Sequence, residues 1–402
     1  MNQLRIFNSM TGRKELFSSE TGNVGVYVCG ITPYDVTHLG HAFTYTFFDV
    51  VVRYLRYLRY GVTYVQNLTD IDDDILKKAE QENKNWRRLA EENTQKYLED
   101  MRWLNNLQPD VYPKATDHIE DAIHIVMELK KKSKAYEIDG NVYFNTNSDK
   151  EYGKLSKLSR QEMLPIANEH GNDPNDPKKR DPLDFVLWQA KKPGEPSWRS
   201  PWGEGRPGWH IECSTMSMKY LGESVDIHGG GGDLKFPHHE SSIAQSEHLT
   251  GKQFVKYWMH TGMVRYKGEK MSKSLGNLVL LRDLKEKYSP NIIRTYLLSH
   301  HYRSVWEFKD DEDEEMIKAL ERDKLFKKVW LAQSGMGEPL DISEYEKGFF
   351  EAMNDDFNTP VAMDNLKNLA DHVLKHGDKH SGDAKAFLNK AFNILGLAIE
   401  YE

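Results

Sequence analysis

Strand-like and helix-like segments alternate within residues 1–105, and this alternation limits the possible fold more than any other feature. An apolar run spans residues 24–29, a helical pattern follows over residues 44–58, and a second strand-like run spans residues 62–67. Strands that alternate with helices pair in a parallel sheet, and such sheets bind ligands beyond the carboxyl ends of their strands. The sequence therefore predicts an α/β fold with a ligand site at one edge of the sheet.

The rest of the chain divides into three regions. Residues 106–200 combine a helical stretch with a segment rich in Pro, Asp and Lys, which is typical of an inserted subdomain with exposed loops. Residues 201–304 return to apolar strands and glycine-rich loops, and residues 305–402 are strongly helical. We expect a nucleotide-binding domain in two halves (1–105 and 201–304), an inserted connective subdomain and a C-terminal helical bundle.

Composition places the chain among soluble globular proteins, with 39% apolar and 29% charged residues. It has no run of 18 apolar residues and no signal-peptide core at its N-terminus, so we expect a cytoplasmic protein without a membrane segment. Cys29 and Cys213 are its only cysteines, which argues against a disulfide framework. The formal charge of −8 argues against a broadly basic nucleic-acid surface, although a local patch could lie within it.

Two short motifs contain residues suited to phosphate chemistry. His38-Leu39-Gly40-His41 follows the first strand, and Lys270-Met271-Ser272-Lys273-Ser274 lies in a glycine-flanked loop. His38 and His41 are three residues apart at the start of a predicted helix, where free N–H groups and the helix dipole favour phosphate. Gly40 lets a nucleotide approach closely.

The second motif supplies cations to the same chemistry. Lys270 and Lys273 are predicted to reach the β- and γ-phosphates of ATP, with Ser272 and Ser274 as small donors. Attack of a carboxylate on the α-phosphorus builds negative charge that such donors stabilise. The competing interpretation is a solvated Lys/Ser loop and two histidines with local partners.

Two charged clusters are interpreted as structural. The acidic run 310–315 precedes a helical pattern that continues to about residue 330, and negative charge suits the first turn of a helix. Lys130-Lys131-Lys132 ends another helical pattern, where cations suit the dipole.

A third group of residues offers metal-ligating atoms. Cys29, Cys213 and the pair His238-His239 are far apart in sequence, and their spacing is not that of a zinc finger. By spacing alone, two small buried thiols and a core histidine with a local partner remain the better interpretation.

The motifs together resemble the cysteinyl-tRNA synthetase family. They are Tyr27-Val28-Cys29-Gly30, His38–His41, the GWHIEC sequence at 208–213, the DIHGGGGDLKFPHHE sequence at 226–240 and Lys270–Ser274. The resemblance implies a class I synthetase-type Rossmann domain that forms cysteinyl-adenylate from L-cysteine and ATP, with Mg²⁺. It also implies one Zn²⁺ per chain. A monomer is expected.

Within this family, the sequences of two motifs are similar to those of the MshC branch, which joins cysteine to the amine of glucosaminyl-inositol in mycothiol synthesis. These are GITPYD at 30–35 and THLGHA at 37–42. The chain also ends where a tRNA-charging member would continue into a domain that reads the anticodon. We therefore expect transfer of cysteine to a small amino sugar. The alternatives are a compact ligase that charges tRNA-Cys, and an inactive protein that binds cysteine or RNA as a regulator.

The resemblance also implies the metal ligands. The tRNA-charging members of the family have a glutamate where this chain has Ser242. A hydroxyl is a poor Zn²⁺ ligand, so the protein is expected to supply Cys29, Cys213 and His238 and to leave one position for the substrate thiolate. His239 could support the ligands from outside or replace one of them.

Further residues take roles by resemblance. Those around the cysteine are Gly30, Thr32, Thr69, Trp209 and Asp233, and Gly230 and Gly231 would let the backbone approach the adenosine. Asp233 suits an ammonium group, and Trp209 would exclude water from the adenylate. In the competing interpretation, Trp209 is a core residue, Asp233 belongs to a turn and the glycines form a flexible turn.

Overall fold

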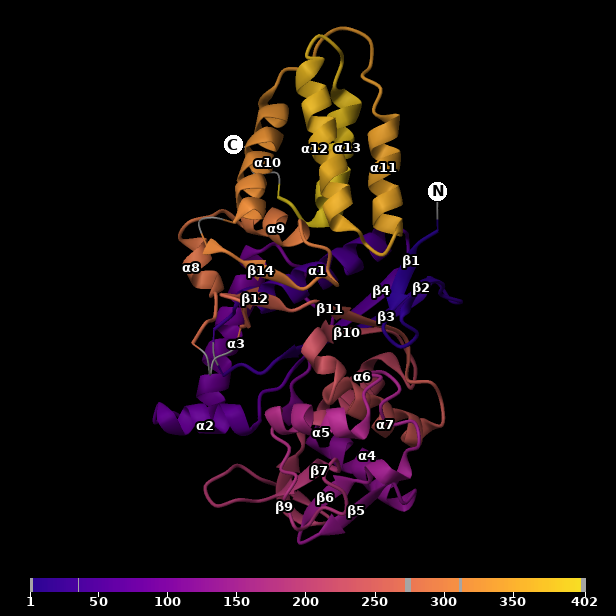
Figure 1. Cartoon of the computed structure of the whole chain (residues 1–402), viewed down its shortest axis with the longest axis vertical. Helices are drawn as coiled ribbons and strands as arrows, with labels where there is room; N and C mark the ends of the chain where they lie inside the picture. The colour runs from indigo at the N-terminus through magenta and orange to yellow at the C-terminus, as the bar shows by residue number, and fades with distance from the viewer. Residues whose placement is uncertain (1–2, 35, 272–275, 311–312, 399–402) are drawn as a thin grey trace.

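The computed structural model describes residues 3–34, 36–271, 276–310 and 313–398. It is elongated and has three tiers (Figure 1). A parallel sheet occupies the middle, a helical bundle lies at one end, and an antiparallel sheet with its helices lies at the other.

The central sheet has four parallel strands in the order β11-β10-β3-β4. Two come from before the inserted region, β3 (Asn23–Ile31) and β4 (Gly61–Leu68), and two from after it, β10 (Val225–Gly231) and β11 (Val255–Thr261). The prediction of a parallel α/β sheet interrupted by an insertion is confirmed. Among the described residues, no helix is both long and apolar enough to cross a membrane.

Alternation along β3 gives the sheet two different faces. Val26 and Val28 point into the core that contains α1 (Leu39–Tyr57). Tyr27 and Cys29 belong to the opposite core, which also includes residues of α6 (Trp209–Leu221) and α7 (His238–Thr250). Side chains on a strand alternate between faces, so Cys29 is directed toward the two later helices.

The close approach of α1 to the sheet requires a glycine. A Cβ atom at Gly229 of β10 would lie 2.0 Å from the ring of Phe48, which is fully buried on α1. This glycine therefore lets the helix pack closely against the sheet. Three glycines of the run, 229–231, end strand β10, and Gly232 begins a short 3-10 helix, so the run is not a flexible turn.

The inserted region forms a five-stranded antiparallel sheet in the order β5-β6-β7-β9-β8. Its strands are β5 (Ala135–Ile138), β6 (Asn141–Phe144), β7 (Phe185–Ala190), β8 (Trp198–Ser200) and β9 (Gly203–Pro207), and its helices are α4 (Ile119–Lys131) and α5 (Arg160–Glu169). Helices α2 (Asp73–Gln81) and α3 (Trp86–Trp103) precede it.

Smaller elements connect these parts. They are β1 (Arg5–Asn8), β2 (Arg13–Leu16), β12 (Val264–Tyr266), β13 (Glu269–Lys270), β14 (Trp306–Phe308) and α8 (Leu281–Lys285). The boundaries predicted at residues 105, 200 and 304 stay predictions.

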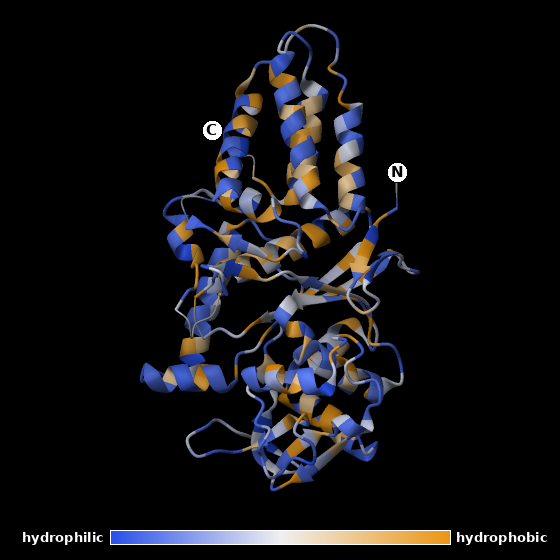
Figure 2. Ribbon diagram, in the orientation of Figure 1, coloured by the Kyte–Doolittle hydropathy of each residue, from blue (hydrophilic) through white to orange (hydrophobic). Residues whose placement is uncertain are grey.

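The C-terminal helices form a bundle of amphipathic helices (Figures 1 and 2). They are α10 (Glu314–Leu331), α11 (Ser343–Asn354), α12 (Thr359–Lys375) and α13 (Gly382–Leu395). Asp313 caps α10 by accepting hydrogen bonds from the backbone N–H groups of Glu315 and Met316, so the acidic run begins a helix as predicted. Asp311 and Glu312 lie outside the described residues.

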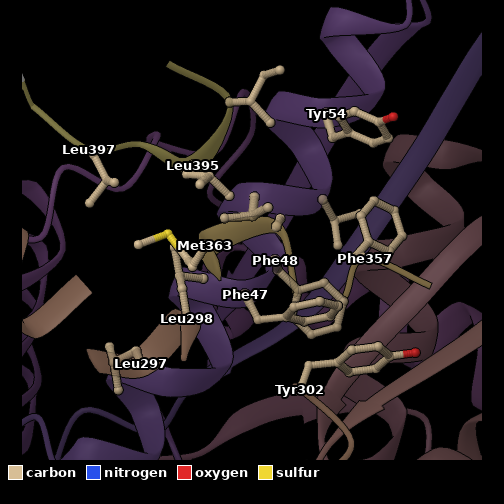
Figure 3. Close-up of a cluster of buried hydrophobic side chains, with 14 of the residues drawn as sticks. Phe47, Phe48, Tyr54, Leu297, Leu298, Tyr302, Phe357, Met363, Leu395 and Leu397 are labelled. Atoms are coloured by element: carbon tan, nitrogen blue, oxygen red, sulfur yellow. The ribbon is translucent and has the colours of Figure 1, made fainter. Parts of the chain in front are cut away.

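Apolar side chains join α1 to the bundle and to the segment after α9 (Pro290–Leu298) (Figure 3). The rings of Phe47 and Tyr302 stack at 4.0 Å, and the ring of Phe357 meets Phe47 edge-on. The Tyr54 hydroxyl donates to the side chain of Asn354, 2.9 Å away. One continuous core therefore includes the central domain and the base of the bundle.

A buried ion pair lies inside this core. Arg294 of α9 contacts Asp49 of α1, and both side chains are almost fully buried. The guanidinium also donates to the backbone oxygens of Leu104 (2.9 Å) and Leu395 (2.5 Å) and to the side chain of Asn106 (2.5 Å). One side chain thus joins α1, α9, the end of α3 and the end of α13.

Replacement of Arg294 tests this arrangement. Removing one partner of a buried, hydrogen-bonded ion pair typically costs about 3–5 kcal/mol, because the other charge stays buried. We expect Arg294→Met to lower the thermal unfolding midpoint by several degrees, measured by circular dichroism. Arg282→Met is the control, because Arg282 is 66% exposed and its one ion pair within the described part of the chain is with its neighbour Asp283. Equal midpoints for the two variants would contradict the proposed role of Arg294.

Candidate active site

The first predicted motif forms the start of α1. His38 is the N-cap residue, and its Nδ1 atom accepts hydrogen bonds from the backbone N–H groups of Gly40 (3.1 Å) and His41 (3.4 Å). The rings of His38 and His41 stack with their centroids 3.7 Å apart. The two histidines therefore lie side by side at the helix N-terminus, as predicted, where the dipole favours anions.

Backbone hydrogen bonds hold the segment after the second motif beside the first motif. The N–H of Leu39 donates to the carbonyl of Val279 (2.8 Å), and the N–H of Leu281 donates to that of Thr37 (3.0 Å). A Cβ atom at Gly40 would lie 3.7 Å from the methyl group of Met271. The two motifs, far apart in sequence, are adjacent in space. Ser272, Lys273 and Ser274 lie outside the described residues.

Lys270 ends β13 with its side chain half exposed. Its ammonium lies 3.6 Å from the carboxylate of Asp233, which is also partly exposed. An ion pair in this setting contributes little stability and separates easily. Asp233 was predicted to hold the ammonium group of the substrate, and in this structure its partner is the lysine of the second motif.

The three predicted metal ligands come together at the carboxyl edge of the sheet. Cys29 comes from β3, Cys213 from α6 and His238 from the first position of α7. Their ligand atoms all lie within 4.8 Å of one another, and all three residues are buried. Two thiols and an imidazole form a donor set typical of Zn²⁺, so these residues fit the expected metal.

The two thiols are electrostatically coupled. Their sulfur atoms lie 3.5 Å apart. Burial and the hydrogen bond with Cys213 raise the pKa of Cys29. Burial also acts to raise the pKa of Cys213, but the hydrogen bond from Cys29 and the nearby His238 outweigh it and lower that pKa below its usual range. The pair can thus lose one proton readily, which prepares it for a cation.

Ser242 does not contribute to this cluster. It is fully buried on α7, and its hydroxyl donates to the backbone carbonyl of His238, 2.9 Å away. A serine hydroxyl commonly makes this bond to the carbonyl four residues earlier in a helix. The expectation of three protein ligands stays a prediction.

Trp209 covers the metal-type cluster. Its ring stacks on that of His238, with centroids 4.4 Å apart and planes 19° apart. The Nδ1 atoms of His238 and His210 are 3.1 Å apart. Trp209 also lines a cavity of about 530 Å³, together with Asp72, His170 and other residues of the inserted region. It therefore separates the cluster from a larger space.

Asn67 organises the end of β4, and sequence reasoning did not assign it a role. Its side-chain oxygen accepts from the N–H of Gly30 (2.8 Å), and its amide donates to the hydroxyl of Thr69 (3.3 Å). A Cβ atom at Gly30 would lie 1.6 Å from the Asn67 carbonyl oxygen, so only glycine fits. Gly30 and Thr69 are thereby held beside the Cys213 sulfur, which is 3.6 Å from Asn67. The run Asn67–Asp70 at the strand end was the available signal.

Carboxyl groups lie beside these residues, and the sequence did not predict a role for them either. Glu212 is buried, burial raises its pKa, and its Oε2 atom has no hydrogen-bond partner among the described residues. Asp70 accepts from the backbone and hydroxyl of Thr116. Thr32 is hydrogen-bonded to Asp72, where burial raises the pKa to about 7. Carboxyl groups therefore surround the ends of β3 and β4.

Histidines complete the other side of the cluster. The Nε2 atoms of His228 and His239 lie 3.4 Å and 3.1 Å from the Cys29 sulfur. Burial lowers the pKa of both histidines well below the usual value, so both are neutral. Gly230 is next to the His239 ring, and Gly231 is next to Asp233. His228 lay within a quoted motif, but nothing in its spacing marked it.

Known proteins share both the sequence and the fold of this chain. The family model described as the class I (C) tRNA synthetase catalytic domain matches residues 16–319, and that of the DALR domain matches residues 348–400. The cysteine–tRNA ligase of Thermococcus onnurineus is 45% identical over 412 residues, which cover 99% of this chain and 85% of that relative. The chain belongs to the class I (C) tRNA synthetase family.

Two further comparisons agree with this membership. The cysteine–tRNA ligase of Aquifex aeolicus is 44% identical, over 95% of this chain and 79% of that relative. A solved structure of Mycobacterium tuberculosis methionyl-tRNA synthetase with methionyl-adenylate superposes with a TM-score of 0.65 at 14% identity, over 93% of this chain and 87% of that one. The latter supports the fold alone. The predicted synthetase-type fold, and an ATP-dependent, AMP-forming ligase, are confirmed.

The predicted small-amine acceptor is wrong, and the MshC branch is not supported. Relatives that are 45% identical over almost the whole chain are cysteine–tRNA ligases. The prediction of a small-amine acceptor depended on a few motif residues, on the position of the C-terminus and on the net charge. A net charge of −8 is a sum over the whole molecule and does not describe a local surface.

The raised pKa of Asp72 gives a pH-dependent prediction. Because its folded pKa of about 7 exceeds the usual value of 3.8, Asp72 stabilises the fold most at low pH, and this contribution is lost as the pH rises toward 7. Asp72 caps α2 by accepting from the N–H of Ile75 (2.8 Å), and asparagine can replace it as a cap. We expect the unfolding midpoint of Asp72→Asn, relative to the parent, to rise between pH 5 and pH 8.

The matched control is Glu80→Gln, which removes a negative charge from an exposed residue near the other end of the same helix. Differential scanning calorimetry at both pH values measures the effect. A difference between Asp72→Asn and the parent that stays constant with pH would contradict the raised pKa.

Proposed function

We propose that this protein is a cysteine–tRNA ligase that activates L-cysteine with ATP and transfers it to tRNA-Cys. The observation that carries the proposal is the convergence of two thiols and His238 within 4.8 Å at the edge of the sheet where α1 begins. A soft-metal donor set suits a thiol substrate, and a helix N-terminus with two histidines suits ATP. The tRNA acceptor is inferred from the relatives, which are cysteine–tRNA ligases.

Activation of cysteine uses the start of α1 and the second motif. His38 and His41 would stabilise the charge that develops when the cysteine carboxylate attacks the α-phosphorus, and pyrophosphate would leave. Gly40, Gly230 and Gly231 would allow the nucleotide close to the backbone. Lys270, with Ser272 and Lys273, would neutralise the leaving phosphates together with Mg²⁺. The Lys270–Asp233 pair is exposed, so Lys270 can exchange its partner.

Selection of cysteine uses the buried cluster. Cys29, Cys213 and His238 would hold one Zn²⁺, which when bound supplies a soft Lewis acid for the substrate thiolate and disfavours serine. Gly30, Thr32 and Thr69 lie at the strand ends beside the cluster, where they can orient the amino and carboxyl groups. Trp209 would exclude water from the adenylate because it already covers His238.

The second substrate is expected at the cavity beside Trp209. Its lining includes Lys178, Lys191 and Lys192 of the inserted region, whose side chains are partly or fully exposed and could contact a phosphate backbone. Four aspartates, at 72, 73, 173 and 176, line the same cavity. A 3′-terminal hydroxyl that reaches past Trp209 would attack the carbonyl carbon of the adenylate and release AMP. A cytoplasmic location would suit this activity.

The direct test is aminoacylation of a tRNA-Cys transcript with radiolabelled cysteine. We expect ATP-dependent cysteinyl-tRNA, and no product with serine, because a hydroxyl ligates Zn²⁺ poorly. A serine-specific tRNA transcript is the nucleic-acid control. ATP–pyrophosphate exchange with cysteine but without transfer to tRNA-Cys would contradict the proposed acceptor.

Removing the ammonium of Lys270 should slow activation. Loss of one preorganised charge donor typically costs about 10²–10³ in kcat, so we expect Lys270→Ala to lower cysteine-dependent pyrophosphate exchange by about a hundredfold. Lys267→Gln is the control, since Lys267 is an exposed lysine in the preceding turn. Both variants should retain the same metal content. Exchange at the parent rate in Lys270→Ala would remove Lys270 from the mechanism.

A further inference from the structure

A line of hydrogen-bonding groups runs from the metal-type cluster across the sheet. The Cys29 sulfur lies 3.1 Å from Nε2 of His239, whose Nδ1 lies 2.8 Å from Nε2 of His260. Nδ1 of His260 lies 2.8 Å from the hydroxyl of Ser9. A second histidine, His228, approaches Cys29 separately, with its Nε2 3.4 Å from the sulfur.

The fold fixes this arrangement. Cys29, His228 and His260 lie on the neighbouring strands β3, β10 and β11, and His239 lies in the first turn of α7. All four side chains are buried. The ring of Trp258 stacks on that of His228 at 4.6 Å and also contacts His239 and His260. The imidazoles therefore have little freedom to turn.

The direction of the hydrogen bonds follows once Cys29 is a metal ligand. A metal-bound cysteine is a thiolate and can only accept, so both Nε2 atoms must carry a proton and donate to it. With Nε2 of His239 as the donor to sulfur, its Nδ1 can accept from His260, and Nδ1 of His260 can accept from the hydroxyl of Ser9. Each described contact along the line has one donor and one acceptor.

His228 agrees with this assignment. Its Nδ1 atom is buried and has no hydrogen-bond partner among the described residues. If Nε2 carries the proton, Nδ1 is an acceptor without a hydrogen, whereas the other tautomer would leave a buried N–H unpaired. An unpaired buried donor is the rarer and more costly case.

The distances are those of hydrogen bonds to sulfur. The Nε2 atoms of His239 and His228 lie 3.1 Å and 3.4 Å from the Cys29 sulfur. Cys29, His228 and His239 could also hold an ion by proximity, and the experiment separates that role from hydrogen bonding.

We propose that His228 and His239 are positioning residues that donate two N–H···S hydrogen bonds to the metal-bound thiolate of Cys29. His260 and Ser9 fix the tautomer and orientation of His239. The inference depends on the metal site in the proposed function, and it adds residues outside the ligand set.

The chemical consequence concerns the substrate. Hydrogen bonds to a ligating sulfur favour the thiolate that the metal binds, and they also reduce the charge that this sulfur donates to the metal. A metal that receives less charge from Cys29 attracts the incoming thiolate more strongly. The histidines would thus tune the cluster toward substrate binding and also hold the Cys29 side chain in place.

The test compares His239→Leu, which removes the donor, with His239→Gln, whose side-chain amide can still donate. Zinc affinity is measured by chelator competition, and the coordination by absorption spectra of the Co²⁺-substituted protein. We expect the Leu variant to bind Zn²⁺ about 10–100-fold more weakly, as is typical for loss of an outer partner, and the Gln variant to retain most of the affinity. The sulfur-to-cobalt charge-transfer band should shift in the Leu variant, with the number of ligands unchanged.

His118→Leu is the control for loss of a buried histidine, since His118 contacts Asp121 and Tyr220 away from the cluster. His260→Leu should weaken zinc binding less than His239→Leu, because it acts through His239. Parent-like affinity and spectrum in a folded His239→Leu variant would overturn the inference, as would loss of one nitrogen ligand from the cobalt spectrum. If the parent binds no metal, the metal site of the proposed function fails first, whereas failure in the variants alone leaves that site intact.

Discussion

The buried contact between Asp49 and Arg294 holds α1 in place, and the active site depends on the position of that helix. Asp49 lies within α1, whereas His38 and His41 lie at its start. A guanidinium with four acceptors around it is costly to displace, because each broken bond would leave a buried polar group unpaired. The helical region that follows the central domain therefore stabilises α1, whose start is the proposed nucleotide-binding end.

The two-residue period of β3 then divides the chemistry between the faces of the sheet. Val26 and Val28 pack toward α1, and Tyr27 and Cys29 pack toward α6 and α7. The residues proposed to bind ATP and the metal-type cluster consequently arise from opposite layers and meet at the carboxyl edge of the strands. In the proposed function, a cysteine whose thiol binds on one side and whose carboxylate reacts on the other would lie across that edge.

Sequence predicted the parallel sheet, the helix start at His38 and the meeting of Cys29, Cys213 and His238. The first two follow from periodicity and capping, and the third came from resemblance. Asn67, His228 and His260 could not be assigned, because their roles depend on strand register and on which face each side chain occupies. Asp233 was assigned from its charge, which could not reveal that its partner is Lys270. The acceptor was predicted wrongly because the net charge and a few motif residues do not describe a binding surface.

Cys29 contacts residues from both layers of the domain. Its sulfur meets Cys213, His228 and His239, and its carbonyl accepts from the hydroxyl of Tyr45 on α1. The same residue therefore contacts both layers of the domain. Any shift of α1 that follows nucleotide binding would reach the metal-type cluster through the Cys29 backbone, and any shift of the thiolate would reach α1 by the same route. A single strand end thus connects the start of α1, proposed to bind ATP, with the cluster proposed to bind the thiol.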